Sequence, residues 1–390
     1  MQRILLAIFF LGCFGVAAAQ APQPPEVAAR NFLVIDLNSG KVLAEREADA
    51  AADPASLTKL MTAYLVFSAL RDKKLALEQT LPVSLRAWAE RKGGGSLMFV
   101  DTTMTPRVEE LLRGMIVQSG NDAAVALAEG VAGSLDQFVA LMNRQAVDFG
   151  MKNTAFKNVT GLTETGHHSS ARDIATIASR IIRDFPDFYP LYSMREYRYN
   201  NISQPNRNLL LRRDPTVDGM KTGFTEAAGY CLVASSVRDF PNLGQAAVQP
   251  GKRRLLSVVL NTTSMEARAS ESQKLLNWGF QAFDTVRLFD DNQPMATAEV
   301  WKGKTKEAKL GTAAGVFVTV PKGDAGKLET RMERTEPLLA PLAKGQRVGT
   351  VKVSTPGGQP VLDAPLVVLE AVEPAGLLGR AWDSIRLWIR

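Results

Sequence analysis

The residue pair with the clearest chemical potential is Ser56 and Lys59, in the largely apolar stretch 52–70. Asp53 suits an N-cap and Pro54 suits the first helical position, so the sequence predicts a helix that begins here. Ser56 then lies in the first turn, and Lys59, three residues later, projects from the same face. Burial among apolar neighbours favours the neutral form of a lysine, and a neutral amine can activate a serine nucleophile. The alternative is a capped core helix whose one lysine reaches solvent.

A second short motif, Ser119-Gly120-Asn121, lies between two stretches with helical periodicity. A serine on such a loop can relay a proton to a leaving amine. The Asn121 amide can orient Lys59 and also form a hydrogen bond with a substrate amide. Alone, the motif is equally typical of an ordinary turn between helices.

A third motif, Lys221-Thr222-Gly223, falls at the end of a predicted strand. Lys221 and Thr222 offer a cation and a hydroxyl to a carboxylate, and Gly223 leaves room for a close backbone approach. We expect the backbone amides of Ser56 and Phe224 to form an oxyanion hole. Each motif is weak alone, but the three in this order and at wide separation indicate acyl transfer by a serine.

Other kinds of site are poorly represented. His167 and His168 are the two histidines, and because they are adjacent they do not have the spacing of a helical metal pair; we interpret them as loop residues. We find no Cys/His metal cluster and no glycine-rich phosphate loop, so no metal and no cofactor is expected. The 46 Lys and Arg residues against 40 Asp and Glu residues include no dense basic run, so no nucleic-acid partner is expected.

Residues 1–21 have the pattern of a secretory signal peptide. Arg3 gives the positive start, residues 4–16 the apolar core, and the alanines up to Ala21 the cleavage site. The protein is therefore expected to be exported. Cleavage would leave Cys231 as the one cysteine, so no internal disulfide can form, and its apolar surroundings favour core packing.

The remaining chain is expected to divide into a domain at 22–283, a second at 284–373 and a tail at 374–390. The first has strand patterns near both ends with helices between them, which predicts an α/β fold with helices flanking an antiparallel sheet. Gly93-Gly94-Gly95-Ser96 is expected to border its cleft. The second has short β runs separated by Gly, Pro and Lys turns, which predicts a small all-β domain. In the first domain the expected strands are 31–47 (as a hairpin), 217–223, 229–237 and 255–261, and the expected helices include 108–117, 122–131, 134–149, 171–182 and 268–283.

The tail, 376–390, is amphipathic. Tryptophans and arginines on a short terminal helix are typical of a helix that lies in the plane of a membrane surface. The alternative is a helix docked on its own domain, and residues 373–376 favour the membrane because they separate the helix from the last strand. The apolar side chains that share one arc of the helical wheel are Leu377, Leu378, Ala381, Trp382, Ile385, Trp388 and Ile389, with Leu387 as the exception on the opposite side.

The sequence as a whole resembles the low-molecular-mass penicillin-binding proteins that act as D-alanyl-D-alanine carboxypeptidases. The resemblance rests on stretches such as DPASLTKLMTAYLVF, LLRGMIVQSGNDAAVALAE, SSARDIATIA and VDGMKTGFTEAAGYCLVASS, and it extends more weakly to the tail. It implies a serine β-lactamase/DD-peptidase-like fold, removal of the terminal D-alanine from peptidoglycan stem pentapeptides, and covalent inhibition by β-lactams. It also implies a periplasmic protein held peripherally on the inner membrane by its C-terminal helix.

The residues that the resemblance marks as catalytic are Ser56, Lys59, Ser119 and Asn121; those it marks as substrate-binding are Lys221, Thr222, Gly223 and Phe224, joined by Arg207 of an Arg-Asn pair. Phe224 stands where the family often has a histidine. Two alternatives stay open: a serine β-lactamase of the same fold, and a non-catalytic peptidoglycan-binding protein. Against the β-lactamase, the chain has SGN in place of SDN, and the loop around Glu164 does not resemble the deacylating loop of class A enzymes.

Overall fold

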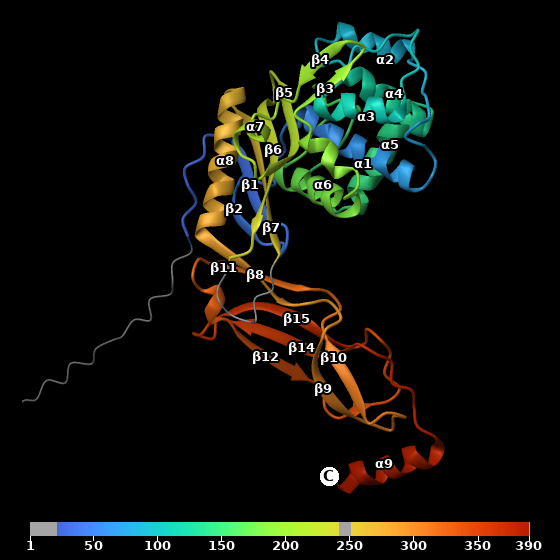
Figure 1. Cartoon of the computed structure of the whole chain (residues 1–390), viewed down its shortest axis with the longest axis vertical. Coiled ribbons are helices and arrows are strands. Elements are labelled where there is room, and N and C mark those ends of the chain that lie inside the picture. Colours follow the sequence, from blue (N-terminus) through green and yellow to red (C-terminus); the bar gives the residue numbers. More distant parts are fainter. Residues whose placement is uncertain (1–21, 242–250, 390) are drawn as a thin grey trace, which may run out of the picture.

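The computed structural model describes residues 22–241 and 251–389, so the predicted signal peptide at 1–21 lies outside the described residues. The molecule is elongated, with a larger α/β domain at one end, an all-β domain below it and a terminal helix at the far end (Figure 1). The predicted fold class, an α/β domain followed by an all-β domain and a C-terminal helix, is confirmed.

The α/β domain is built on a five-stranded sheet in the order β2-β1-β7-β6-β5, with every neighbouring pair antiparallel. Successive side chains of a strand point to opposite faces, and both faces are buried. On β1, Leu33 contacts the core on one face and Val34 the core on the other. The strands are β1 (Asn31–Asp36), β2 (Val42–Arg46), β5 (Val217–Thr225), β6 (Gly229–Asp239) and β7 (Lys252–Thr262).

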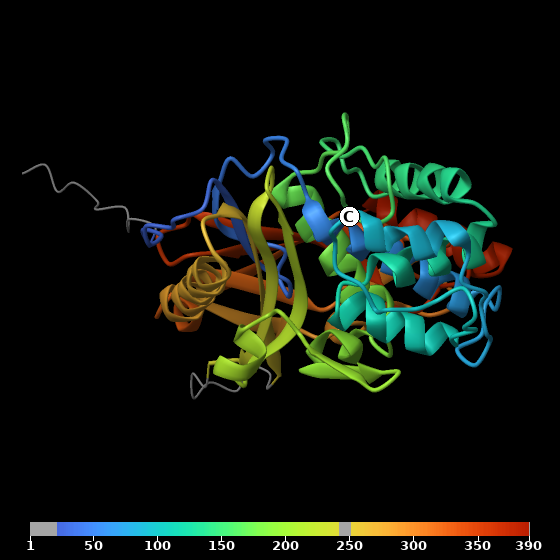
Figure 2. The ribbon, with the colours of Figure 1, turned by 90° about the horizontal axis from the view of Figure 1, so that it is seen from above.

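Helices cover the two faces of this sheet unequally. Helix α8 (Met265–Ala282) covers one face, and a cluster of helices covers the other (Figure 2). Within the cluster α1 is central, and it is buried almost all round, as its apolar sequence predicts. The cluster contains α1 (Lys59–Arg71), α2 (Leu85–Ala89), α3 (Val108–Val117), α4 (Asn121–Ala132), α5 (Leu135–Asp148) and α6 (Ala171–Asp184). The shorter elements are η1 (Ala55–Thr58), η2 (Glu90–Lys92), η3 (Tyr189–Ser193), β3 (Glu196–Tyr199), β4 (Ile202–Pro205) and α7 (Leu210–Arg213).

The start of the serine-bearing segment differs from the prediction. Asp53 does not cap an α-helix: Ala55–Thr58 form a 3₁₀ turn whose N-cap is Pro54, without a side-chain cap, and the regular helix begins at Lys59. Ala55 has a left-handed φ of 46°. The backbones of Gly161 and Gly223 both lie close against this turn, since a Cβ atom on Gly161 would be 1.8 Å from the Ala55 carbonyl oxygen and one on Gly223 would be 3.1 Å from the Ala55 Cβ.

The all-β domain has its own core, to which seven of its eight strands contribute side chains, whereas every residue of β12 is exposed. Six of the eight strands form a sheet in the order β12-β14-β15-β10-β9-β13, and β11 pairs with β8. The strands are β8 (Phe283–Phe289), β9 (Pro294–Trp301), β10 (Glu307–Gly311), β11 (Val316–Pro321), β12 (Glu329–Arg334), β13 (Leu338–Leu339), β14 (Arg347–Ser354) and β15 (Pro360–Val368), with a short η4 (Ala325–Lys327). The C-terminal helix α9 (Leu377–Ile389) follows.

A buried polar junction joins the two domains. The fully buried Asp36 carboxylate forms an ion pair with Arg253 at 2.8 Å and accepts a hydrogen bond from the Thr285 hydroxyl at 2.6 Å. Arg253 also donates to the Phe283 carbonyl at 2.7 Å. Because a buried carboxylate is costly to leave unpaired, these bonds resist separation of the domains.

Among the helices of residues 22–241 and 251–389, none has by itself the length and apolarity needed to cross a bilayer, and only α4 and α5 taken together, bent by 85°, pass such a test.

Candidate active site

The side chain of Lys59 lies at the centre of the predicted site. Its Nζ atom is 3.0 Å from Ser56 Oγ, 2.7 Å from Asn121 Oδ1 and 2.7 Å from the Thr160 carbonyl oxygen. The amide and carbonyl oxygens can only accept, so each takes one N–H of a neutral amine. The lone pair is then free for the Ser56 hydroxyl, and the geometry allows Ser56 to give its proton to Lys59.

Burial also sets the protonation state of this lysine. Lys59 is 2% exposed, and burial lowers its pKa from 10.5 to about 7. The negative charges of Glu90 and Asp122 oppose this shift, whereas the positive charge of Arg207 adds to it. A base is most effective when its pKa lies near the working pH, and Lys59 meets that condition.

Ser119 and Lys221 form a second hydrogen-bonded pair in the site. Ser119 sits between α3 and α4 with a left-handed φ of 65°. Lys221 on β5 donates to Ser119 Oγ at 2.8 Å and to the Thr222 carbonyl at 3.0 Å. Burial holds the pKa of Lys221 well below its usual value, and the nearby charges of Lys59 and other cations lower it further. This pair can hold a proton between hydroxyl and amine.

The glycine-rich segment is fixed beside these motifs by the carboxylate of Asp122. The carboxylate accepts hydrogen bonds from the backbone N–H groups of Met98, Phe99 and Val100 at 2.8, 2.8 and 3.1 Å. The backbone N–H of Asn121 donates to the Ser96 carbonyl at 2.7 Å. The sequence expectation that this segment borders the cleft is confirmed.

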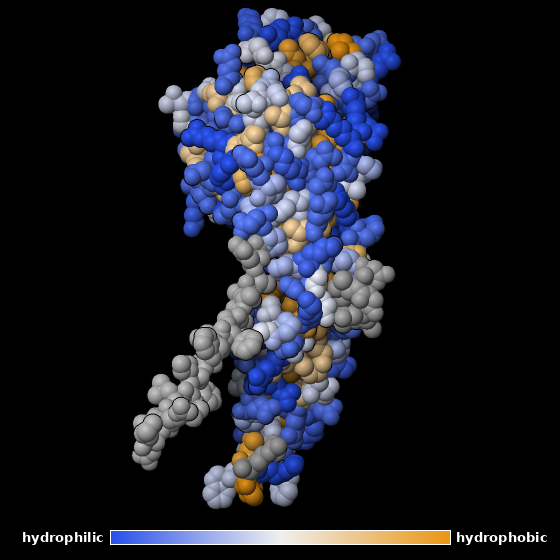
Figure 3. All heavy atoms as spheres, turned by 90° about the vertical axis from the view of Figure 1, so that its left-hand side faces the viewer, coloured by the Kyte–Doolittle hydropathy of each residue, from blue (hydrophilic) through white to orange (hydrophobic). Residues whose placement is uncertain are grey.

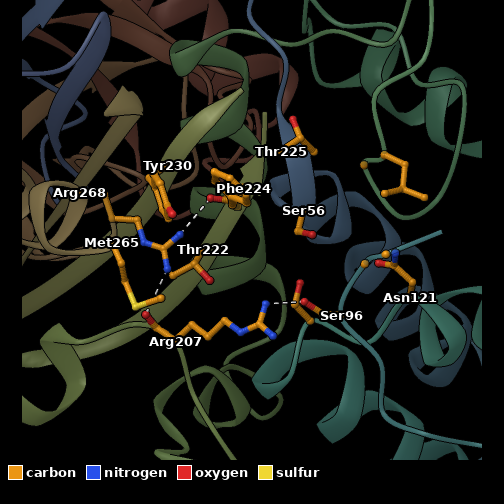
Figure 4. Close-up of a pocket in the computed structure, with 16 residues that line it drawn as sticks. Ser56, Ser96, Asn121, Arg207, Thr222, Phe224, Thr225, Tyr230, Met265 and Arg268 are labelled. Atoms are coloured by element: carbon orange, nitrogen blue, oxygen red, sulfur yellow. Dashed lines mark hydrogen bonds between the residues drawn. The ribbon is translucent and has the colours of Figure 1, made fainter. Parts of the chain in front are cut away.

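These elements enclose a pocket of about 300 Å³ beside Ser56 (Figure 4). In the close-up, Ser56 lies between the β5 side chains of Thr222 and Phe224 and the Asn121 side chain. None of the described residues that line the pocket is acidic, so it favours an anionic group. The lining residues are Ser56, Gly94, Gly95, Ser96, Ser119, Asn121, Gly161, Leu162, Arg207, Thr222, Gly223, Phe224, Thr225, Tyr230, Met265 and Arg268.

Two arginines reach the pocket from outside the three motifs. Arg207, a predicted binding residue, hydrogen-bonds to the Ser96 hydroxyl across the pocket. Arg268 on α8 donates to the carbonyls of Gly223 at 3.0 Å and of Arg207 at 3.3 Å. Sequence reasoning missed Arg268, because a single arginine at the start of an amphipathic helix gives no signal of a site.

His167 lies in a loop, as predicted, and its side chain is held by specific contacts. It is 4% exposed; its Nδ1 accepts from the Lys157 backbone N–H at 3.0 Å, so Nε2 carries the proton and donates to Thr58 Oγ1 at 2.8 Å. Burial lowers the pKa of His167 to about 4. The imidazole therefore ties the loop that carries Thr160 to the turn that carries Ser56.

The Phe224 side chain is 49% exposed and packs against its cross-strand partner Tyr230, with the rings tilted by 34° and their centroids 4.3 Å apart. A Cβ atom on Gly223 would lie 3.3 Å from the Ser56 backbone nitrogen, so the strand runs close beside the serine turn. The oxyanion hole of the Ser56 and Phe224 amides stays a prediction. Cys231 is fully buried, as expected for core packing.

Among the described residues, no group of three or more His, Cys, Asp or Glu side chains is arranged to hold a metal ion.

Comparisons with known proteins agree along the whole chain. Residues 18–263 match the family described as D-alanyl-D-alanine carboxypeptidase, and residues 283–374 match the C-terminal domain of penicillin-binding protein 5. The chain is 42% identical to the D-alanyl-D-alanine carboxypeptidase DacC of Escherichia coli, covering 97% of this chain and 93% of that protein. It is 41% identical to DacA of the same organism, with 99% and 96% covered. The crystal structure of penicillin-binding protein 5 from Haemophilus influenzae matches with a TM-score of 0.84 at 39% identity, over 90% of this chain and 100% of that one.

Proposed function

The chain belongs to the D-alanyl-D-alanine carboxypeptidase family, and from this premise we propose how its residues carry out the reaction. The protein is a serine-type carboxypeptidase that removes the terminal D-alanine from peptidoglycan stem pentapeptides. In our proposal the acyl-enzyme forms on Ser56. The observation that carries this assignment is the placement of Ser56 Oγ 3.0 Å from Lys59 Nζ, whose other contacts are two pure acceptors.

Acylation begins when Ser56 Oγ attacks the carbonyl carbon of the penultimate D-alanine and its proton passes to Lys59. The amides of Ser56 and Phe224 hold the developing oxyanion, at about 3–4 kcal/mol for one donor in comparable enzymes. The proton then reaches the leaving nitrogen through Ser119, and free D-alanine departs. In deacylation a water gives one proton to Lys59, attacks the ester, and Ser56 recovers its proton.

The carboxylate of the terminal D-alanine binds among the cations of the pocket. Thr222 offers a hydroxyl, and Arg207 and Arg268 offer guanidinium groups on the same side of Ser56 (Figure 4). Lys221 lies behind Ser119 and donates a hydrogen bond to its hydroxyl. A charge-assisted contact of this kind selects a free C-terminus over an internal peptide bond.

In our proposal β-lactams acylate the same serine, and the resulting acyl-enzyme is hydrolysed slowly. A class A β-lactamase uses a glutamate to activate the deacylating water. Here none of the described residues lining the pocket is acidic, and Glu164 is exposed and accepts from Asn158. This supports the carboxypeptidase over the β-lactamase alternative.

The test is mass spectrometry of the mature protein after incubation with penicillin, together with hydrolysis of a synthetic pentapeptide. We expect a long-lived adduct on the peptide that contains Ser56, and loss of both labelling and hydrolysis in Ser56→Ala. An adduct that disappears within seconds would favour the β-lactamase, and intact pentapeptide with no adduct would favour a non-catalytic binding protein. Unchanged labelling of Ser56→Ala would refute the assignment of the nucleophile.

We also propose the cellular arrangement: export directed by residues 1–21, a catalytic domain at 22–283, an all-β domain at 284–373, and a membrane-binding tail at 374–390 in the periplasm. The proposed membrane binding of the tail is supported by the exposure of the large apolar side chains on one arc of the helix, which ranges from 53% for Ile385 to 89% for Trp388. Deletion of 376–390 is expected to give a protein that hydrolyses pentapeptide normally but no longer sediments with membranes. Unchanged sedimentation would contradict the tail assignment.

A further inference from the structure

The polar side of α9 is bound to the all-β domain through one buried carboxylate. The Asp383 side chain is 2% exposed, although nearly all its neighbours on the helix are exposed. It accepts a hydrogen bond from the Lys302 backbone N–H at 2.7 Å and forms an ion pair with Lys306 Nζ at 2.8 Å. These contacts, together with the nearby Arg386, lower the pKa of Asp383, so the carboxylate is ionised at neutral pH.

The segment that leads into the helix is bound as well. The Ala375 N–H donates to the Lys302 carbonyl at 2.7 Å, and the Lys304 N–H donates to the Glu373 carbonyl at 2.8 Å. The sequence predicts that residues 373–376 separate the helix from the last strand. They do separate the helix from the last strand, but they are hydrogen-bonded to the turn between β9 and β10.

The position of Leu387, the apolar exception on the polar side of the helical wheel, indicates which side of α9 lies toward the all-β domain. Leu387 lines a cavity together with Trp301 of β9, and the Arg386 guanidinium lies 5.2 Å from the Trp301 ring centroid. The helix thus contacts its domain through Asp383 and Arg386, and Leu387 lines the same cavity as Trp301. The apolar arc is left outside: Leu378 is 88% exposed and Trp388 is 89% exposed.

This docking fixes the direction in which the apolar arc points. The helix lies across the long axis, at the end opposite the catalytic domain (Figure 1), and apolar residues gather at that end (Figure 3). A helix that binds in the plane of a membrane buries its apolar face in the headgroup region. A bilayer that covers this arc would therefore lie across the long axis of the molecule.

We propose that α9 and the end of the all-β domain form one preset docking surface for a flat lipid bilayer, with Asp383 as the group that sets its orientation. The inference rests on the proposed membrane attachment and adds that the helix is not a loose tether. The bound protein stands upright, and the buried junction of Asp36, Arg253 and Thr285 transmits this orientation to the catalytic domain. The active site is thereby held at a fixed height above the lipid.

The experiment measures the height of the catalytic domain above vesicles of phosphatidylethanolamine and phosphatidylglycerol. A donor dye is attached to mature full-length protein at Glu226→Cys, an exposed position between β5 and β6. An acceptor dye is placed on the lipid headgroups. The native cysteine of the mature chain, Cys231, is buried and does not compete for the label. Co-sedimentation of the same samples reports binding separately from height.

The two test variants are Asp383→Asn and Lys306→Met, which loosen the contact from opposite sides, and the control is Ser384→Ala, on the same helix. Ser384 is exposed, and its hydroxyl donates within the helix to the Arg380 carbonyl. We expect low energy transfer for the parent and the control, and at least a twofold rise in both test variants while the bound fraction is unchanged. Unchanged transfer in both test variants, or loss of binding in them, would overturn the proposal. If the parent itself does not sediment with vesicles, the proposed membrane attachment fails first.

Discussion

The state of Lys59 can be tested by placing a negative charge against it with almost no change of shape. Asn121 Oδ1 accepts a hydrogen bond from Lys59 Nζ at 2.7 Å, so Asn121→Asp puts a carboxylate at that distance. An opposite charge within about 4–6 Å shifts a pKa by about 1–3 units toward the charged form. The pKa of Lys59, about 7 in the parent, is then expected near 8–10. The parent at pH 7 has about half of this amine neutral, and the variant about one tenth to one thousandth.

The assay is the second-order rate of penicillin acylation, measured by stopped flow from pH 5 to pH 10. In the parent the rate should rise with pH up to about 7 and then level off, because only neutral Lys59 accepts the serine proton. In Asn121→Asp the rise should move to higher pH, with acylation about fivefold to five-hundredfold slower at pH 7 and partly recovered at pH 9. The exposed Asn201→Asp serves as the control for the substitution type. A variant whose rate is lower at every pH, with the rise still near pH 7, would refute the assignment of Lys59 as the base.

Two further predictions concern the neighbours of the serine turn. His167 has a pKa of about 4 when folded, below the unfolded value of about 6.5, so its contribution to stability is present above pH 6.5 and is lost as the pH falls toward 4. Urea unfolding should therefore show a loss of about 2 kcal/mol between pH 7 and pH 5 that is absent in His167→Gln; an identical loss in both proteins would exclude His167 as the source. A Cβ on Gly161 would lie 1.8 Å from the Ala55 carbonyl oxygen, so Gly161→Ala should displace the turn and slow penicillin acylation at least a hundredfold. The control is Gly150→Ala, because Gly150 also has a left-handed φ but a Cβ atom there meets nothing within 4 Å. This variant should lose about 1 kcal/mol of stability and keep the parent's acylation rate. Equal effects of the two variants on acylation would contradict the steric argument.

Much of the fold could be predicted from the sequence, because the local patterns of apolar and polar residues agree with the helices and strands of the structure. The periodicity of the helices α3 and α4 gave bounds within one residue of the observed ones, since each has a buried face and a clear boundary. The strands of the catalytic sheet were found from their apolar runs, although β7 begins earlier than expected, at Lys252, because polar residues continue its pairing with β6. The prediction that an α-helix begins at Asp53 and Pro54 was wrong. Asp53 has the residue type of a cap, but contacts from Gly161 and Gly223, distant in sequence, decide the local conformation.

The sequence by itself determined the chemistry, because a nucleophile, a base and a carboxylate-binding cation are defined by residue type. It predicted the contacts of Lys59 with Ser56 and Asn121, but it could not show that the Thr160 carbonyl also holds the amine, since the three acceptors come from three separate segments. Nor could it determine whether the C-terminal helix is free or docked, because the helical wheel describes one helix and not its neighbours. Those properties arise from desolvation and from contacts between distant segments, which exist only once the chain has folded.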